Sequence, residues 1–128
     1  MTGKLKVIVI DDEPIVGKRL KPALEKSGYE VEFYDNGPAA LKRLSETGFH
    51  IVVTDFRMDE VDGIEVLTRV KKASPATKVI IITGYATIEV TREALAKGAF
   101  DVIAKPFKPN ELREIIQNAA EALRSESA

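Results

Sequence analysis

The sequence predicts an α/β fold, in which helices cover both faces of one parallel β-sheet. Short β-branched runs alternate with stretches of helical periodicity along the 128 residues. Three of these runs, Val7–Ile10, Ile51–Val53 and Val79–Ile82, are apolar at every position, as in strands buried on both faces. The length fits a single domain, and the hydrophobic content of 45% is sufficient for a core.

The five predicted strands are Leu5–Ile10, Val31–Tyr34, Ile51–Thr54, Val79–Thr83 and Val102–Ala104. The second alternates apolar and polar residues, which favours an edge position. Successive parallel strands are joined by right-handed crossovers. We therefore expect a flavodoxin-like (βα)5 domain with a doubly wound five-stranded sheet and the strand order 2-1-3-4-5.

Helices fill the intervals between these strands. Gly28, Gly48 and Gly98 each follow a helical stretch, where a residue in the left-handed conformation is common. Asp62 lies three residues before Glu65, a spacing similar to a capping box at a helix start.

The last helix has the clearest periodicity. Pro109 stands where first-turn prolines are common. Apolar residues then recur with a period of about 3.6: Leu112, Ile115, Ile116, Ala119, Ala120 and Leu123. We expect a domain over residues 4–123 and a loose C-terminal tail over residues 124–128.

Composition excludes several classes of protein. The chain has 19 Lys and Arg and 20 Asp and Glu, for a net charge of −1, which argues against binding nucleic acid or membrane through bulk charge. No apolar stretch approaches the roughly 20 residues of a membrane span. Cys is absent and His50 is the only histidine, so a disulfide framework, thiol chemistry and a zinc site are not expected. These features fit a cytoplasmic domain.

Polar side chains follow the predicted strands. Asp11 and Asp12 follow the first, Asp55 follows the third, Thr83 ends the fourth, and Lys105 follows the fifth. Ligands of open α/β sheets bind at the carboxyl ends of the strands, near the point where the strand order reverses. We therefore expect these five side chains to converge.

Their chemistry is complementary. Crowded carboxylates repel one another unless a cation joins them, and oxygen ligands of this kind suit Mg²⁺. A carboxylate can also attack phosphorus and form an aspartyl phosphate. Phosphoryl transfer then requires positioning and charge neutralisation, which a metal ion, an ammonium group and a hydroxyl supply.

Each residue alone has a simpler interpretation. Asp55 alone is as well explained by an Asx-turn after a strand. Thr83 alone suits a strand end or helix cap, and Lys105 alone suits a solvated turn. Glu13 is interpreted only as favourable charge at the N-terminus of the first helix, and His50 as structural. The prediction is specific because all of these residues occur together, in this order along the chain.

Together these motifs resemble the response-regulator receiver domain of two-component signalling, over about residues 4–123. The motifs are Val9–Glu13, Thr54–Met58, Asp62–Gly63, Ile82–Gly84 and Lys105–Phe107. The stretch around Thr83 is also somewhat similar to receivers attached to enhancer-binding ATPase activators.

The resemblance implies that Asp55 accepts a phosphoryl group from a sensor histidine kinase. It implies that Asp12, assisted by Asp11, holds Mg²⁺ together with Asp55 and the backbone carbonyl of Arg57. A receiver catalyses only its own phosphorylation and dephosphorylation, so it is not a conventional enzyme.

The resemblance also implies that Lys105 pairs with Asp55 before the reaction and with a phosphoryl oxygen afterwards. Thr83 would hydrogen-bond the phosphoryl group. A cis peptide is expected at Lys105–Pro106. The readout surface would be the fourth helix, fifth strand and fifth helix, at about residues 88–123, which would mediate homodimerisation or partner docking.

Two positions depart from the family pattern. Asp59 stands where proline is common, and Val102 stands where an aromatic residue usually turns inward upon activation. Val102 is too small for that movement, which leaves backbone shifts or Tyr85 to transmit the change. A degenerate receiver that docks partners independently of phosphorylation is therefore an alternative.

Two other functions fit less well. Haloacid dehalogenase-like phosphatases require Asp-x-Asp after the first strand, whereas this strand is followed by Asp11-Asp12-Glu13. A flavin or nucleotide binder requires a phosphate-binding loop there, and this loop is acidic. No effector domain lies within the 128 residues, so the domain either acts alone or belongs to a longer regulator.

Overall fold

A computed structural model of the chain describes residues 3–84 and 87–127. Five strands alternate with five helices, in this order: β1 (Lys6–Ile10), α1 (Pro14–Lys26), β2 (Glu30–Tyr34), α2 (Gly37–Glu46), β3 (Ile51–Asp55), α3 (Gly63–Ala73), β4 (Lys78–Thr83), α4 (Ile88–Ala96), β5 (Asp101–Ala104) and α5 (Pro109–Ser127). All strand pairs are parallel and the sheet order is β2-β1-β3-β4-β5. The predicted flavodoxin-like fold is confirmed.

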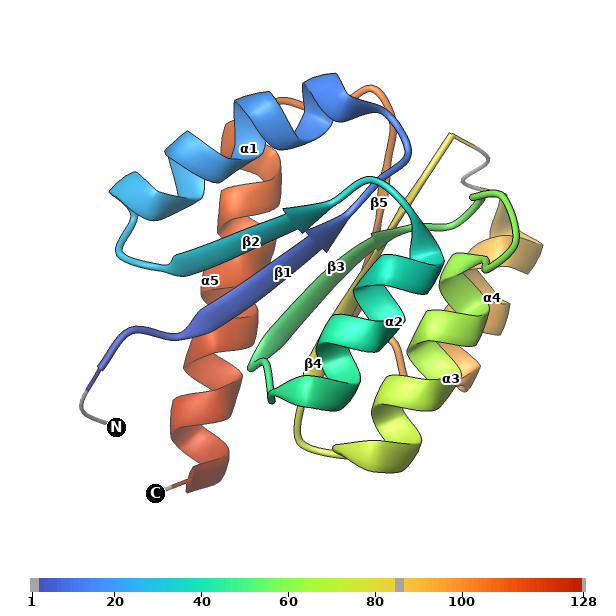
Figure 1. The fold of residues 1–128 in the computed structure, drawn as a ribbon. Helices are drawn as coiled ribbons and strands as arrows, with labels where there is room; N and C mark the ends of the chain where they lie inside the picture. The colour runs from blue at the N-terminus through green and yellow to red at the C-terminus, as the bar shows by residue number, and fades with distance from the viewer. Residues whose placement is uncertain (1–2, 85–86, 128) are drawn as a thin grey trace.

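The sheet separates two apolar layers, with α1 and α5 on one face and α2, α3 and α4 on the other (Figure 1). Alternate residues of the central strands serve the two layers. In β1, Val7 and Val9 pack toward α1 and α5, whereas Ile8 and Ile10 pack toward the other helices. This double burial explains why the central strands are apolar at consecutive positions.

Strand register sets the ends of the central strands at one level. Asp55 is the register partner of Ile82, and Thr83 is the register partner of Ala104. Two further backbone bonds extend the ladder: Phe56 N–H donates to the Ile82 carbonyl at 2.7 Å, and Lys105 N–H donates to the Thr83 carbonyl at 2.8 Å. The residues after β3 and β5 therefore leave the sheet beside β4.

The helix ends agree with the sequence at most positions. Gly28 and Gly98 have φ values of 95° and 103°, as predicted, and Asp62 accepts a hydrogen bond from Glu65 N–H at 2.8 Å. The prediction for Gly48 is wrong, because its φ is not positive. There the chain leaves α2 through extended Thr47 (φ −152°, ψ 154°), so no left-handed residue is required.

The expected loose tail is also not observed, because α5 continues through Ser127. Two contacts hold its last turns. Lys78 Nζ lies 2.6 Å from a carboxylate oxygen of Glu126, and Ser127 Oγ donates to the Leu123 carbonyl at 2.8 Å. Ala128 lies outside the described residues. Among helices of residues 3–84 and 87–127, none combines the length and apolar character needed to cross a membrane.

Candidate functional site at the carboxyl edge of the sheet

The carboxyl ends of β1, β3 and β5 bring three predicted site residues into contact. Lys105 Nζ lies 2.9 Å from Asp11 Oδ2 and 3.1 Å from Asp55 Oδ2. Asp11 is fully buried and Asp55 is nearly so, whereas the Lys105 side chain is 19% exposed. The ammonium group therefore reaches into the sheet edge from the solvent side.

A third carboxylate, that of Glu13, belongs to this contact. Its Oε1 atom lies 2.8 Å from Lys105 Nζ. The interpretation of Glu13 as helix-terminus charge alone was incomplete: its side chain makes no capping hydrogen bond in α1 and contacts Lys105 instead. The signal available in the sequence was its position directly after the acidic pair, at the N-cap of a helix that starts at the same edge.

The backbone fixes the direction of these side chains. Asp11 Oδ1 accepts a hydrogen bond from Glu13 N–H at 2.9 Å, an Asx-turn of the kind expected after a strand. The loop after β3 passes close to Gly63, where a Cβ would collide with the Asp55 carbonyl oxygen. Glycine at this position therefore allows α3 to start against the end of β3.

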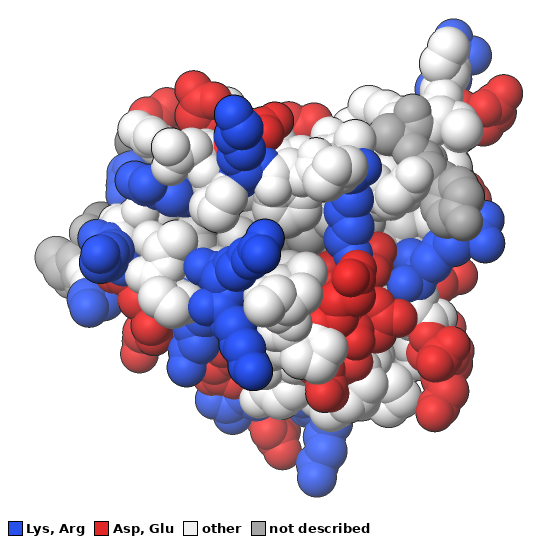
Figure 2. Space-filling view, turned by 90° about the horizontal axis from the view of Figure 1, so that it is seen from above, with Lys and Arg blue, Asp and Glu red and all other residues white. Residues whose placement is uncertain are grey.

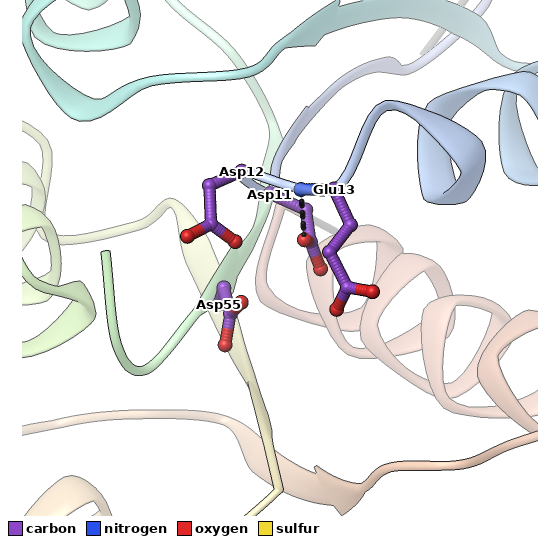
Figure 3. Close-up of side chains that lie close together, drawn as sticks. All are labelled: Asp11, Asp12, Glu13 and Asp55. Carbon is purple, nitrogen blue, oxygen red and sulfur yellow. Dashed lines mark hydrogen bonds between the residues drawn. The ribbon is translucent and has the colours of Figure 1, made fainter. Parts of the chain in front are cut away.

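Asp12, Arg57 and Thr83 occupy different positions around the contact. Asp12 is exposed, and its carboxylate faces the space beside Asp55 (Figure 3). Arg57 supplies a backbone hydrogen bond to the Asp55 carboxylate. Thr83 is fully buried at the end of β4, and its carbonyl receives the Lys105 N–H.

The site has an excess of negative charge. Carboxylate oxygens of Asp11, Asp12, Glu13 and Asp55 all lie within 4.8 Å of one another. Figure 2 looks down on this edge and shows acidic side chains gathered in a patch with basic side chains directly beside it. Within the described chain, Lys105 is the cation in ion-pair contact with this cluster.

Burial and repulsion shift the pKa values in the cluster. Burial, followed by the charge of Asp11, raises the pKa of Asp55 to about 6 from its ordinary 3.8, although Lys105 opposes this shift. Burial likewise raises the pKa of Asp11. Burial alone would lower the pKa of Lys105, but the hydrogen bond to Glu13 and the negative charge of Asp11 outweigh it and the pKa is raised.

These residues fit a divalent cation. Asp11 Oδ2 is buried and accepts no hydrogen bond from the described residues, although Lys105 is within ion-pair distance. Such an oxygen retains the capacity to bind a cation. The carboxylate of Asp12 lies on the side of the cluster that Lys105 does not contact. Oxygen donors in this arrangement suit Mg²⁺.

The two departures from the family pattern lie in β5 and in the loop after β3. Val102 is half-buried in β5 and packs on the layer formed with α2, α3 and α4. Asp59 lies in the exposed loop after Asp55, where its carbonyl accepts from Val61 N–H at 2.6 Å. The Lys105–Pro106 peptide is cis, as expected. Tyr85 lies outside the described residues.

The fold and this edge define a receiver of the two-component type. The model of the response regulator receiver domain family matches residues 7–117, and the chain belongs to that family. A solved structure described as a CheY-like response regulator receiver domain protein from Methanospirillum hungatei superposes with a TM-score of 0.92. It is 29% identical and the match covers 97% of this chain and 99% of that one.

Two curated relatives show how such a domain occurs. The chain is 38% identical to the regulatory protein AtoC of Escherichia coli over 119 residues, which cover 93% of this chain and 26% of AtoC. It is 34% identical to the response regulator receiver protein CpdR of Brucella abortus over 118 residues, which cover 92% of this chain and 96% of CpdR. The chain thus spans about a quarter of one relative and nearly all of the other.

Proposed function

We propose that this domain accepts a phosphoryl group on Asp55 from the phosphohistidine of a sensor kinase in the cytoplasm, in a Mg²⁺-dependent reaction. One observation carries the proposal. The Asp55 carboxylate lies 3.1 Å from the Lys105 ammonium and within 4.8 Å of oxygens of Asp11 and Asp12. A nucleophile, a fixed cation and a set of metal ligands therefore meet at one point.

In the proposed step, an Asp55 carboxylate oxygen attacks the phosphorus of the donor. The phosphorus–nitrogen bond breaks as the new phosphorus–oxygen bond forms, and the imidazole leaves with the bonding electron pair and takes up a proton. Lys105 neutralises charge on a phosphoryl oxygen. Mg²⁺, held by Asp12, Asp11, Asp55 and the Arg57 carbonyl, would supply further charge neutralisation and alignment.

The acceptor must be ionised to react. Burial opposes this by raising the pKa of Asp55 to about 6, and Lys105 favours it. Fixed positive charge nearby lowers a carboxyl pKa. Lys105 and the cation thus keep Asp55 ionised at neutral pH and then bind the phosphoryl oxygens.

The phosphoryl group adds a charge of about −1.5 to −2. Thr83, next to Lys105 through the backbone bond, would bind it and bias the conformation of α4, β5 and α5. Ile88 is 68% exposed on α4, and Leu95 is also exposed there, so this surface suits homodimerisation or docking of an effector. By analogy with AtoC, the output would be an attached regulatory domain; by analogy with CpdR, the receiver would act by itself.

The test measures intact mass after incubation with Mg²⁺ and acetyl phosphate, and separately with a phosphorylated histidine kinase. We expect an adduct of one phosphoryl group on the parent and none on Asp55→Asn. Asp59→Asn, which removes an exposed carboxylate of the same loop, is the matched control and should still be modified. Modification of Asp55→Asn, or none of the parent with either donor, would refute the assignment.

Val102 supports a second candidate, a docking module that ignores phosphorylation. Without an aromatic side chain at this half-buried position of β5, the usual inward rotation is unavailable. In that case the phosphoryl adduct would form, but the affinity for a partner and the oligomeric state would be the same with and without it. Sedimentation of the modified and unmodified protein separates the two candidates.

A further inference from the structure

We infer that Glu13 competes with the phosphoryl group for the Lys105 ammonium and so limits the affinity of the site for phosphodonors. Glu13 would be a positioning residue that acts through Lys105. This inference rests on the proposed function, because it concerns how the same site receives its substrate.

The resting ammonium group is surrounded by three carboxylates. A lysine ammonium has three N–H donors. The three carboxylates of Glu13, Asp11 and Asp55 lie at 2.8, 2.9 and 3.1 Å from Lys105 Nζ. A phosphoryl oxygen of an incoming donor therefore competes with these three carboxylates for the ammonium group.

Exposure decides which carboxylate gives way. Asp11 is 0% exposed, and the Glu13 N–H holds its other oxygen, so its release would leave a buried charge unpaired, which is costly. Asp55 has to remain in place as the nucleophile. The Glu13 side chain is 59% exposed, so water can replace the ammonium group at little cost.

Glu13 also lies on the Lys105 side of the cluster. Figure 3 shows its carboxylate across Asp11 from that of Asp12. Lys105 contacts Glu13, Asp11 and Asp55 but forms no ion pair with Asp12, within the residues that the structure describes. The role assigned to Glu13 is therefore distinct from metal binding, and its removal should leave the affinity for Mg²⁺ largely intact.

The experiment compares the parent, Glu13→Gln and the control Asp59→Asn. Asp59 has the same charge and lies in the acceptor loop, but makes no ion pair with Lys105 in the described chain. The rate of adduct formation is measured against acetyl phosphate concentration at saturating Mg²⁺. For Glu13→Gln, we expect the half-saturating concentration to fall roughly two- to fivefold, the range for an exposed ion pair, with an unchanged maximal rate.

Further measurements test the same inference by binding and by NMR, without phosphoryl transfer. Titration with beryllium fluoride, a phosphoryl mimic, should show the same gain in affinity for Glu13→Gln, and titration with Mg²⁺ should show less than a twofold change. Nitrogen-15 NMR of the Lys105 ammonium should show faster exchange with water in metal-free Glu13→Gln than in the parent, because one of its three partners is lost.

The outcomes separate this inference from the proposed function. An unmodified parent would overturn both. A modified parent with equal affinities in Glu13→Gln and Asp59→Asn would overturn the role of Glu13 alone, as would a weaker affinity for beryllium fluoride in Glu13→Gln. A large loss of Mg²⁺ affinity in Glu13→Gln would make Glu13 a metal ligand and would overturn the inference as well.

Discussion

Replacing Asp55 with Asn should stabilise the metal-free protein at neutral pH. Burial and the charge of Asp11 raise the pKa of Asp55 from 3.8 to about 6. The folded state therefore binds this proton more tightly than the unfolded state does. The free energy of unfolding then decreases as the pH rises from the unfolded-state pKa through the folded-state pKa. Asn does not ionise and avoids this loss.

The pKa difference sets the size of the effect. A difference of about two pH units, at about 1.4 kcal/mol each, corresponds to about 3 kcal/mol at pH 7. At pH 4, Asp55 is protonated in the folded state and about half protonated in the unfolded state. The expected gain in the free energy of unfolding on replacing it with Asn is then less than about 1 kcal/mol. Since Asn also loses the charge attraction to Lys105, we expect a gain of about 1–3 kcal/mol at pH 7.

The assay is urea unfolding followed by circular dichroism, with a chelator present, at pH 7 and pH 4. Asp59→Asn is the control, because it removes an exposed carboxylate of the same loop and should change the free energy of unfolding by no more than about 0.5 kcal/mol. If Asp55→Asn is no more stable than the parent at pH 7, the buried carboxylate does not carry the cost assigned to it. A gain that is equally large at pH 4 would show that ionisation is not its source.

Three further predictions follow from the site and the readout surface. At a concentration tenfold above its dissociation constant, Mg²⁺ should raise the free energy of unfolding of the parent by about 1.4 kcal/mol, as measured by urea unfolding. The same concentration should stabilise Asp12→Asn much less. Equal stabilisation of both proteins would show that Asp12 does not bind the metal. Gly63→Ala should lower the free energy of unfolding by about 1–3 kcal/mol, because the new Cβ would collide with the Asp55 carbonyl. Gly48→Ala is the control: open space surrounds its new Cβ, so the free energy of unfolding should change by less than about 0.5 kcal/mol. Ile88→Glu should abolish self-association of the phosphorylated protein in sedimentation experiments without altering the mass adduct on Asp55, and persistent dimers would place the interface elsewhere.

The order of the strands and the convergence of polar side chains at one edge of the sheet were predictable because both depend on local patterns. Continuous apolar runs identify strands buried on two faces, and the alternating run of Val31–Tyr34 identifies an edge. Once the order is fixed, residues that directly follow the strands meet at one edge of the sheet. There, Lys105 Nζ lies 2.9 Å from Asp11 Oδ2 and 3.1 Å from Asp55 Oδ2.

Features that depend on distant side chains were not predictable in this way. The contact between Glu13 and Lys105 joins residues 92 positions apart. The position of Glu13 after the acidic pair places it at the correct edge, but whether its side chain caps α1 or turns to the lysine depends on tertiary geometry. The last turn of α5 is held partly by Lys78, through a contact with Glu126. Composition made this segment look loose, whereas a tertiary ion pair and a helix hydrogen bond of Ser127 order it.

The charge of the site suggests what would drive the proposed conformational switch in a domain with valine, and not an aromatic residue, at position 102. Four carboxylates cluster at this edge in the resting domain, and one ammonium group contacts three of them. Burial and the charge of Asp11 raise the pKa of Asp55, so ionising all of these carboxylates together is unfavourable. A cation would relieve that repulsion, and a phosphoryl group would then redirect Lys105. Because the Lys105 N–H bonds to the Thr83 carbonyl, a shift of the lysine that moves its backbone would be transmitted to the end of β4. This route requires no aromatic side chain at Val102, and so the proposed switch is compatible with valine there.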